Sequence, residues 1–154
     1  MVEGMDKSLG DLMDQIEASG IAENTLIFFL GDNGAPLAPS DPNARRNPWD
    51  GSINLPMRGQ KGMLSEGGIR VPLVARWPGR IPAGSTSELP SAFWDFLPTF
   101  ADLTGQELPV PTDGVSLLPT LEGRGGDQED RDYLYWEFQG RQAVRLGRWK
   151  AYRR

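Results

Sequence analysis

The sequence contains no cysteine and no histidine. Without cysteine the chain forms no disulfide, and this absence says nothing about its redox compartment. No stretch reaches the roughly 18 consecutive apolar residues of a membrane-spanning helix, and the first residues lack the pattern of a signal peptide. An excess of positive charge is also missing, because the net charge is −5 with acidic and basic residues interspersed. This balance argues against a surface that binds nucleic acid or an anionic membrane.

The residues that are abundant indicate a folded, loop-rich protein. Hydrophobic residues make up 38% of the 154 residues, and the chain has 19 glycines and 13 prolines. A chain of this length can form one ordinary domain with a core. The composition therefore favours a globular protein over a disordered one.

Apolar spacing predicts a layered arrangement of helices and strands. Apolar residues recur three or four positions apart through residues 2–18, which is the pattern of an amphipathic helix. Residues 25–30 form a continuous apolar run, which predicts a strand covered on both faces. A second buried strand is predicted at 71–77, and a helix at 92–103. Helix followed by buried strand is the repeating unit of a layered α/β fold.

The remaining segments predict loops and a small β region. Residues 35–57 hold five prolines and little periodicity, so they predict a long loop. Residues 104–130 are rich in glycine, proline and acids, as expected at a boundary between subdomains. Residues 133–138 alternate like a strand, and 143–152 predict a hairpin that turns at Gly147-Arg148.

Polar side chains follow the first predicted strand directly. Asp32, Asn33 and Gly34 come straight after the apolar run. In open α/β sheets, ligands bind just beyond the carboxyl ends of strands. A carboxylate beside an amide oxygen suits a hard divalent cation, which prefers oxygen ligands. Asn-Gly after an apolar run is also a common hairpin signal, so a metal site and a tight turn are alternatives here.

Several motifs in a fixed order give the chain a wider resemblance. Gly-Gln-Lys-Gly at 59–62 and Glu-Gly-Gly-Ile-Arg-Val-Pro at 66–72 lie within the segment 55–80. Taken with Asp32-Asn33-Gly34, this segment closely resembles the sulfatase family of the alkaline-phosphatase-like superfamily. Further motifs similar to that family, in the same order, lie at residues 1–10, 94–100, 113–119, 135–137 and 143–150.

The resemblance implies a fold, a division of the chain and an activity. The fold implied is α/β, an alkaline-phosphatase-like sandwich in which helices flank a mostly parallel sheet. Residues 1–121 would be the C-terminal part of the large domain, and 122–154 the beginning of a small C-terminal antiparallel β subdomain. The activity implied is hydrolysis of sulfate esters with a formylglycine nucleophile and a divalent cation. The partner implied is a sulfated small molecule or glycan, and the oligomeric state stays open.

The chain departs from the family pattern in three ways. Sulfatases carry an N-terminal motif of Cys or Ser, any residue, Pro, any residue and Arg, whose first residue is oxidised to formylglycine. Neither form occurs here, and in the nearest stretch, Ser40 to Arg45, Ala44 stands where the arginine belongs. The family's histidines near the sulfate are absent, and Ser65 replaces an aromatic residue of many relatives. We therefore expect formylglycine in a missing N-terminal segment, and a fragment that is inactive alone.

The resemblance also assigns roles to individual residues. Asp32 and Asn33 match the family's metal-binding pair. The resemblance implies Ca²⁺ as the metal, with Mg²⁺ as the alternative, and an all-oxygen pair agrees with that choice. Lys61 matches a lysine that contacts the sulfate, so it is predicted to serve both catalysis and substrate binding. Structural support is predicted from a glycine bend and the charged residues beside it, namely Glu66, Gly67, Gly68 and Arg70.

The long loop and the biological setting leave alternatives open. Arg45, Arg46 and Trp49 are predicted to meet a sulfated sugar by charge and stacking, although a solvated variable loop is the plainer interpretation. A phosphoesterase of the same superfamily would also use acidic metal ligands, typically with histidines. A degenerate copy would be a non-catalytic cation-binding or interaction module. The compartment stays open, and a periplasmic or secreted location is compatible with a full-length parent.

Overall fold

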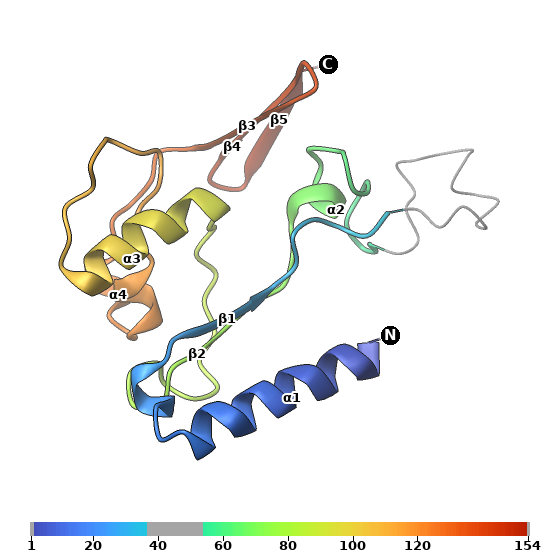
Figure 1. The fold of residues 1–154 in the computed structure, drawn as a ribbon. Coiled ribbons are helices and arrows are strands. Elements are labelled where there is room, and N and C mark those ends of the chain that lie inside the picture. Colours follow the sequence, from blue (N-terminus) through green and yellow to red (C-terminus); the bar gives the residue numbers. More distant parts are fainter. Residues whose placement is uncertain (1, 37–53, 154) are drawn as a thin grey trace. The chain divides into compact units, whose positions relative to one another are not determined.

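The computed structural model describes residues 2–36 and 54–153 (Figure 1). The chain divides into two compact units. The first unit takes its described residues from Met1–Phe28 and Ala75–Asp130, and the second unit from Phe29–Val74 and Arg131–Arg154. Among the described residues, no helix has both the length and the apolar character needed to cross a membrane. The subdomain boundary after residue 121 stays a prediction.

The predicted N-terminal helix is present as α1, which spans Val2–Ala18. Gly20 follows with a φ of 68°, the left-handed conformation for which glycine is favoured after a helix. The short 3₁₀ helix η1, Ala22–Asn24, then leads to the first strand. The described part of α1 has no buried residue, and Val2 is 73% exposed. Its apolar stripe is therefore largely open to solvent.

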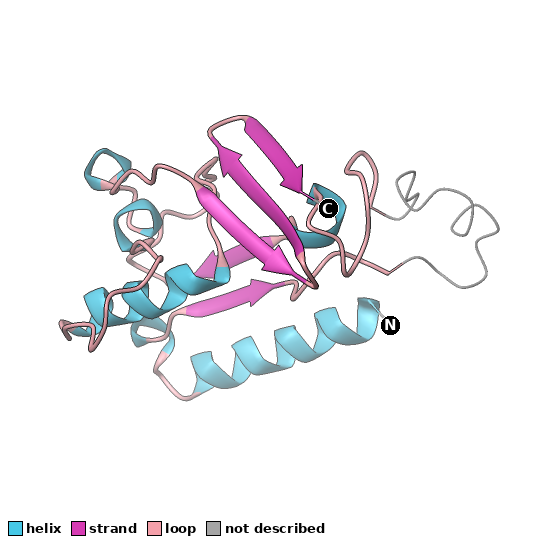
Figure 2. Cartoon of the chain, turned by 90° about the horizontal axis from the view of Figure 1, so that it is seen from above, coloured by secondary structure: helices cyan, strands magenta, loops and turns pink. Residues whose placement is uncertain are grey.

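The two predicted apolar strands pair with each other. Strand β1, Ile27–Leu30, and strand β2, Leu73–Arg76, form a two-stranded sheet. The N–H of Gly31 donates to the carbonyl of Pro72 at 3.2 Å, which joins the end of β1 to the start of β2. The strands are therefore antiparallel, as their arrows in Figure 2 show. A parallel pair is not found among the strands in the described ranges.

These two strands are less covered than their continuous apolar character predicts. Phe29 in β1 is 39% exposed, and Val74 in β2 is 58% exposed. In the part of the chain that the structure describes, each strand has one neighbour in the sheet. A two-stranded sheet buries little of its faces, so the expectation of burial on both faces is wrong for these residues.

The helix predicted at 92–103 is present as the 3₁₀ helix η2, Phe93–Asp95, continued by helix α3, Phe96–Thr104. Asp95 and Thr99 are fully buried polar residues, with 0% exposure. Asp95 Oδ1 accepts from the N–H of Val115 at 3.1 Å, and Thr99 Oγ1 accepts from the N–H of Leu117 at 2.9 Å. Two buried side chains of this segment therefore bind the backbone of residues 113–117. These hydrogen bonds hold the motifs at 94–100 and 113–119 together.

Close packing adds to this fastening in the first unit. A Cβ at Gly114 would lie 2.2 Å from the carbonyl oxygen of Trp94, so only glycine fits there without a shift. The ring of Phe28 in β1 meets Phe96 edge-on, with 5.0 Å between centroids. Trp77 is 6% exposed and donates its indole N–H to the carbonyl of Glu23 at 2.8 Å.

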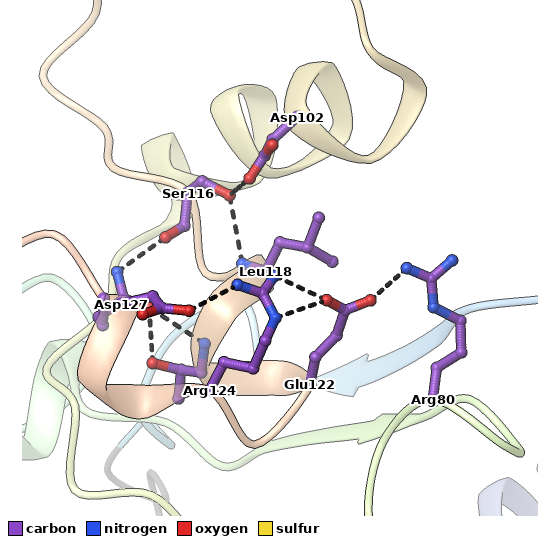
Figure 3. Close-up of polar contacts among 9 residues, drawn as sticks. Arg80, Asp102, Ser116, Leu118, Glu122, Arg124 and Asp127 are labelled. Atoms are coloured by element: carbon purple, nitrogen blue, oxygen red, sulfur yellow. Dashed lines mark hydrogen bonds and ion pairs between the residues drawn. The ribbon is translucent and has the colours of Figure 1, made fainter.

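Helix α4, Leu118–Leu121, and the 3₁₀ helix η3, Gly125–Asp127, complete the first unit. A polar network surrounds them (Figure 3). The carboxylate of Glu122 accepts from Arg80 and from Arg124, and Arg124 also pairs with Asp127 at 3.0 Å.

A three-stranded antiparallel sheet ends the described chain. It runs in the order β3-β4-β5, with β3 at Leu134–Phe138, β4 at Arg141–Leu146 and β5 at Trp149–Arg153. Leu146 pairs with Trp149, so the predicted hairpin turn at Gly147-Arg148 is confirmed.

The β3–β4 turn was not predicted in detail. Gln139 and Gly140 have φ values of 51° and 73°, as in the mirror-image turns that suit hairpins. One face of the sheet is covered in part, because Leu134 is 5% and Ala143 2% exposed while Tyr152 on the same face is 50% exposed. The second unit also contains the single-turn helix α2, Glu66–Ile69.

Candidate functional site

The predicted metal pair lies on the segment directly after β1. The N–H of Asn33 donates to Asp32 Oδ1 at 2.9 Å, and Asn33 Nδ2 donates to the carbonyl of Gly34 at 3.1 Å. Both bonds are local and hold the two side chains in defined orientations. Asp32 Oδ2 and Asn33 Oδ1 accept no hydrogen bond from a described residue. The pair therefore presents two free oxygen atoms of the kind that hard cations bind.

The alternative of a tight hairpin turn at Asn33-Gly34 is not what the structure has. Strand β1 pairs with β2, which lies some forty positions further along the chain. The N–H of Gly34 donates to the carbonyl of Gly68 at 2.9 Å, a contact across the same long separation. The segment therefore runs into a packed cluster of loops instead of returning along β1.

That cluster is built from four glycines, Gly34, Gly59, Gly67 and Gly68, which we call the glycine cluster. A Cβ at Gly34 would lie 1.7 Å from the carbonyl oxygen of Gly67, and one at Gly67 would lie 2.3 Å from that of Gly59. A Cβ at Gly68 would lie 2.0 Å from the carbonyl oxygen of Met63. Backbone thus packs directly on backbone, which no other residue type permits without a shift.

Asn54 clamps the same loops with its side chain. Its Oδ1 accepts from the N–H of Ala35 at 3.0 Å, while its Nδ2 donates to the carbonyls of Ala35 at 3.0 Å and Gly59 at 3.1 Å. The side-chain amide thereby supplies hydrogen-bond partners to backbone groups that belong to no strand or helix. The chain that follows the metal pair and the chain that precedes Lys61 are held together by one residue.

Lys61, the predicted sulfate-binding residue, belongs to the cluster through its backbone. Its N–H donates to the carbonyl of Ala35 at 3.3 Å, two residues after Asn33. Its side chain is exposed, and no described residue forms an ion pair with it. The ammonium is therefore available to an anion next to the segment that carries the metal pair.

Of the predicted supporting residues, Glu66 makes the most contacts. Its carboxylate accepts from Lys150 Nζ at 2.7 Å and lies 3.6 Å from Arg145 Nη1. Arg70 is exposed and caps α2 by donating its N–H to the carbonyl of Glu66, while its guanidinium has no described partner. The bracing role suggested for Arg70 stays a prediction.

The electrostatics of this part of the second unit centre on Lys150. Burial lowers the pKa of Lys150, and its hydrogen bond to Glu66 opposes that shift. The ammonium also lies 4.8 Å from the centroid of the Trp136 ring and 5.6 Å from that of Tyr152. Burial also raises the pKa of the Tyr152 hydroxyl. A charged nitrogen is thus held between two rings and one carboxylate.

The donor set fits a cation by type but is small. In the described ranges, no three acidic side chains gather in a group that could hold a metal ion. Ca²⁺ takes roughly six to eight oxygen ligands, and Asp32 with Asn33 offers two side-chain oxygens. The predicted sugar-binding residues Arg45, Arg46 and Trp49 lie outside the described residues.

Three residues that matter to this geometry were missed by the sequence analysis. Asn54 was part of a loop without periodicity, Lys150 was one position in a predicted strand, and Ser65 was noted only as a departure from relatives. Ser65 is 4% exposed, and its hydroxyl has no hydrogen-bond partner among the described residues. Their roles depend on contacts across the fold, so local sequence carries no signal for them.

Comparison with known families gives one clear match. The family model described as Sulfatase matches residues 1–106 of the chain. A sulfatase of Formosa agariphila is 34% identical over 157 residues, which cover 94% of this chain and 26% of that protein. Human arylsulfatase A is 40% identical over 153 residues, which cover 96% of this chain and 28% of that protein. The chain thus spans little more than a quarter of the length of these relatives.

Solved structures give the same result for the fold. The crystal structure of Ps i-CgsB in complex with k-i-k-neocarrahexaose matches with a TM-score of 0.77 and 31% identity, covering 99% of this chain and 32% of that one. A protein in complex with its substrate D-glucosamine-2-N,6-O-disulfate matches with a TM-score of 0.70 and 30% identity, covering 94% and 28%. The predicted α/β fold class is confirmed by these likenesses.

Proposed function

Because this chain belongs to the sulfatase family, we propose that it is part of a sulfuric ester hydrolase and carries residues that bind the cation and the sulfate. One observation supports this most directly. The hydrogen bonds from Gly34 N–H to Gly68 at 2.9 Å and from Lys61 N–H to Ala35 at 3.3 Å join three motifs that are separate in the sequence. These motifs carry the metal pair, the lysine and the glycine bend.

Asp32 and Asn33 would hold the cation through the two oxygens that accept no described hydrogen bond. The cation proposed is Ca²⁺ in preference to Mg²⁺, because Ca²⁺ tolerates irregular sets of oxygen ligands, whereas Mg²⁺ demands near-ideal octahedral geometry. When bound, it would act as a Lewis acid toward sulfate oxygens. The bond from Asn33 Nδ2 to Gly34 would keep the amide oxygen turned away from its own backbone, toward the ligand.

Lys61 would place positive charge beside the sulfate. Hydrolysis of a sulfate ester builds negative charge on a group that is already anionic, so charge arranged in advance lowers the barrier. The backbone of Lys61 is fixed in the glycine cluster while its ammonium is exposed. A sulfated sugar is the substrate class we propose, supported by similar proteins solved with k-i-k-neocarrahexaose and with D-glucosamine-2-N,6-O-disulfate. Arg45, Arg46 and Trp49 would contact that sugar.

The nucleophile would come from outside this chain. The sequence has no cysteine and no Ser-x-Pro-x-Arg motif that could be oxidised to formylglycine. Electrostatic groups without a nucleophile leave only residual catalysis. We therefore expect the 154-residue chain to release no measurable alcohol from an aryl sulfate.

Calorimetric titration of the purified chain with CaCl₂ tests the cation site. Asp32→Asn should weaken Ca²⁺ binding about tenfold or more, because one anionic ligand becomes neutral. Asp14→Asn on α1 is the matched control and should leave the affinity unchanged. Equal affinity in the wild type and in Asp32→Asn would overturn the assignment of the pair.

Two further assays test the anion site and the inactivity. Lys61→Met should weaken binding of a sulfated monosaccharide while Ca²⁺ affinity stays the same. Turnover of 4-nitrophenyl sulfate by the chain alone, above a heat-denatured control, would contradict the expectation that the chain lacks a nucleophile.

In the whole protein, a preference for phosphate over sulfate esters would favour a phosphoesterase instead.

A further inference from the structure

A part-buried lysine of the C-terminal sheet contacts Glu66, the first residue of helix α2. Lys150 lies on β5, and its side chain is only 10% exposed. Its ammonium donates to Glu66 Oε1 at 2.7 Å. Burying an ammonium costs free energy unless it is paired with good geometry, so a contact of this kind holds both partners firmly.

Glu66 passes this contact to the backbone that supports the metal pair. It is the first residue of α2 and directly precedes Gly67 and Gly68. The N–H of Gly67 donates to the carbonyl of Arg58 at 2.7 Å, and the carbonyl of Gly68 accepts from Gly34 at 2.9 Å. Gly34 is the next residue after Asn33, so an unbroken series of contacts runs from Lys150 to the pair.

We propose that Lys150 is a positioning residue: through Glu66 it holds α2 so that Gly68 fixes the backbone of Gly34 and with it the Asp32-Asn33 pair. The inference rests on the proposed function in one respect, namely that Asp32 and Asn33 are the cation ligands. All residues in the series belong to the second unit.

Arg145 is the obvious competitor for this role, but its geometry is weaker. It pairs with Lys150 in the register of β4 and β5, so both project from the same face of the sheet. Its Nη1 lies 3.6 Å from Glu66 Oε2 and its side chain is 31% exposed, against 2.7 Å and 10% for Lys150. The shorter, more buried contact is the one that depends least on solvent.

The backbone N–H of Gly34 reports this positioning without any need for cation or activity. In Lys150→Met, which keeps the length and apolar stem, hydrogen exchange at Gly34 should become about tenfold faster, the lower end of the loss expected when a hydrogen bond to a charged group is removed. Ca²⁺ affinity of the full chain should fall by a similar factor. The matched control is Lys7→Met, because Lys7 pairs with Asp11 at the same 2.7 Å but lies exposed on α1.

A double-mutant cycle tests whether Lys150 acts through Glu66. If it does, the double variant Lys150→Met/Glu66→Gln should exchange the N–H of Gly34 no more than about twofold faster than the faster single variant. An exchange rate in the double variant that equals the product of the two single increases would overturn the inference. An equal rise in exchange across all protected amides of the second unit would also overturn it, because the lysine would then stabilise the fold in general.

Failure of the inference can be told apart from failure of the proposed function. If Ca²⁺ binds the wild type and Lys150→Met equally well, and Gly34 exchanges at the same rate in both, Lys150 positions nothing. If the wild type binds no Ca²⁺ but Gly34 loses protection selectively in Lys150→Met, the positioning stands and the cation assignment fails.

Discussion

The carbonyl oxygen of Gly67 occupies the space that a side chain at Gly34 would need, only 1.7 Å from the position of an ideal Cβ. The φ of Gly34 is not in the left-handed region, so backbone conformation alone would admit other residues. Close approach is therefore what requires glycine. The Asp32-Asn33 pair is set by backbone contact with a helix that lies far away in the sequence.

Gly34→Ala should destabilise the second unit by about 1–3 kcal/mol or more, the cost of forcing extra atoms into a closed contact. Urea unfolding measures the change. Gly4→Ala is the control, because nothing lies within 4 Å of its Cβ and alanine favours the interior of α1. A Gly34→Ala chain as stable as the wild type would contradict the direct backbone contact.

Asn54→Ala should cost about 2–3 kcal/mol, because it removes three hydrogen bonds and leaves the N–H of Ala35 and the carbonyl of Gly59 without a described partner. The same unfolding experiment measures this loss. Asn24→Ala is the control, since Asn24 is exposed and its side chain bonds to no described residue. Equal stability of the two variants would show that the clamp contributes nothing.

Ser65→Ala should raise stability by about 1 kcal/mol, since no residue in the described ranges bonds to the buried hydroxyl and its removal ends a desolvation cost. Ser65 precedes α2 without forming a side-chain cap, so no cap is lost. Ser116→Ala provides the opposite case, because that hydroxyl donates to Asp102 at 2.7 Å and its loss should destabilise. A fall in stability for Ser65→Ala would mean that its hydroxyl has a partner in solution.

The sequence was informative where a pattern repeats or a turn has a fixed chemistry. The spacing of apolar residues located α1 to its last residue, and Gly147-Arg148 marked the β4–β5 turn. The apolar runs located β1 and β2, but they did not reveal how exposed Phe29 and Val74 are. Coverage of a strand depends on its neighbours, which the strand's own residues do not specify.

The candidate site could be predicted only as a set of residue types in motif order. Asp32, Asn33 and Lys61 were chosen by resemblance, and the backbone bonds that gather their segments lie between residues with no local relation. Asn54 and Lys150 were missed for the same reason. Side chains that complete the hydrogen bonds of distant loops follow from tertiary contact, and no short-range periodicity encodes them.

Acid should weaken the first unit through Glu122. Hydrogen bonds from Arg124 and Arg80 hold the pKa of the Glu122 carboxyl below its ordinary value of 4.5. The folded state therefore binds fewer protons at this site than the unfolded chain does as pH falls past 4.5. The stabilisation from this group is fully present above that pH, and it is lost as pH falls through the lower folded pKa.

Glu122→Gln should accordingly be less stable than the wild type near neutral pH, because Arg80 and Arg124 lose their shared carboxylate (Figure 3). The difference in unfolding free energy should shrink as the pH is lowered from 5 toward 2, since the wild-type carboxyl then becomes neutral as well. Urea midpoints across this range measure it. Glu88→Gln, an exposed position without a described partner, should show no such convergence. A Glu122→Gln difference that stays constant from neutral to acid pH would mean that the two arginines do not depend on the charge of Glu122, and that the network is held by packing alone.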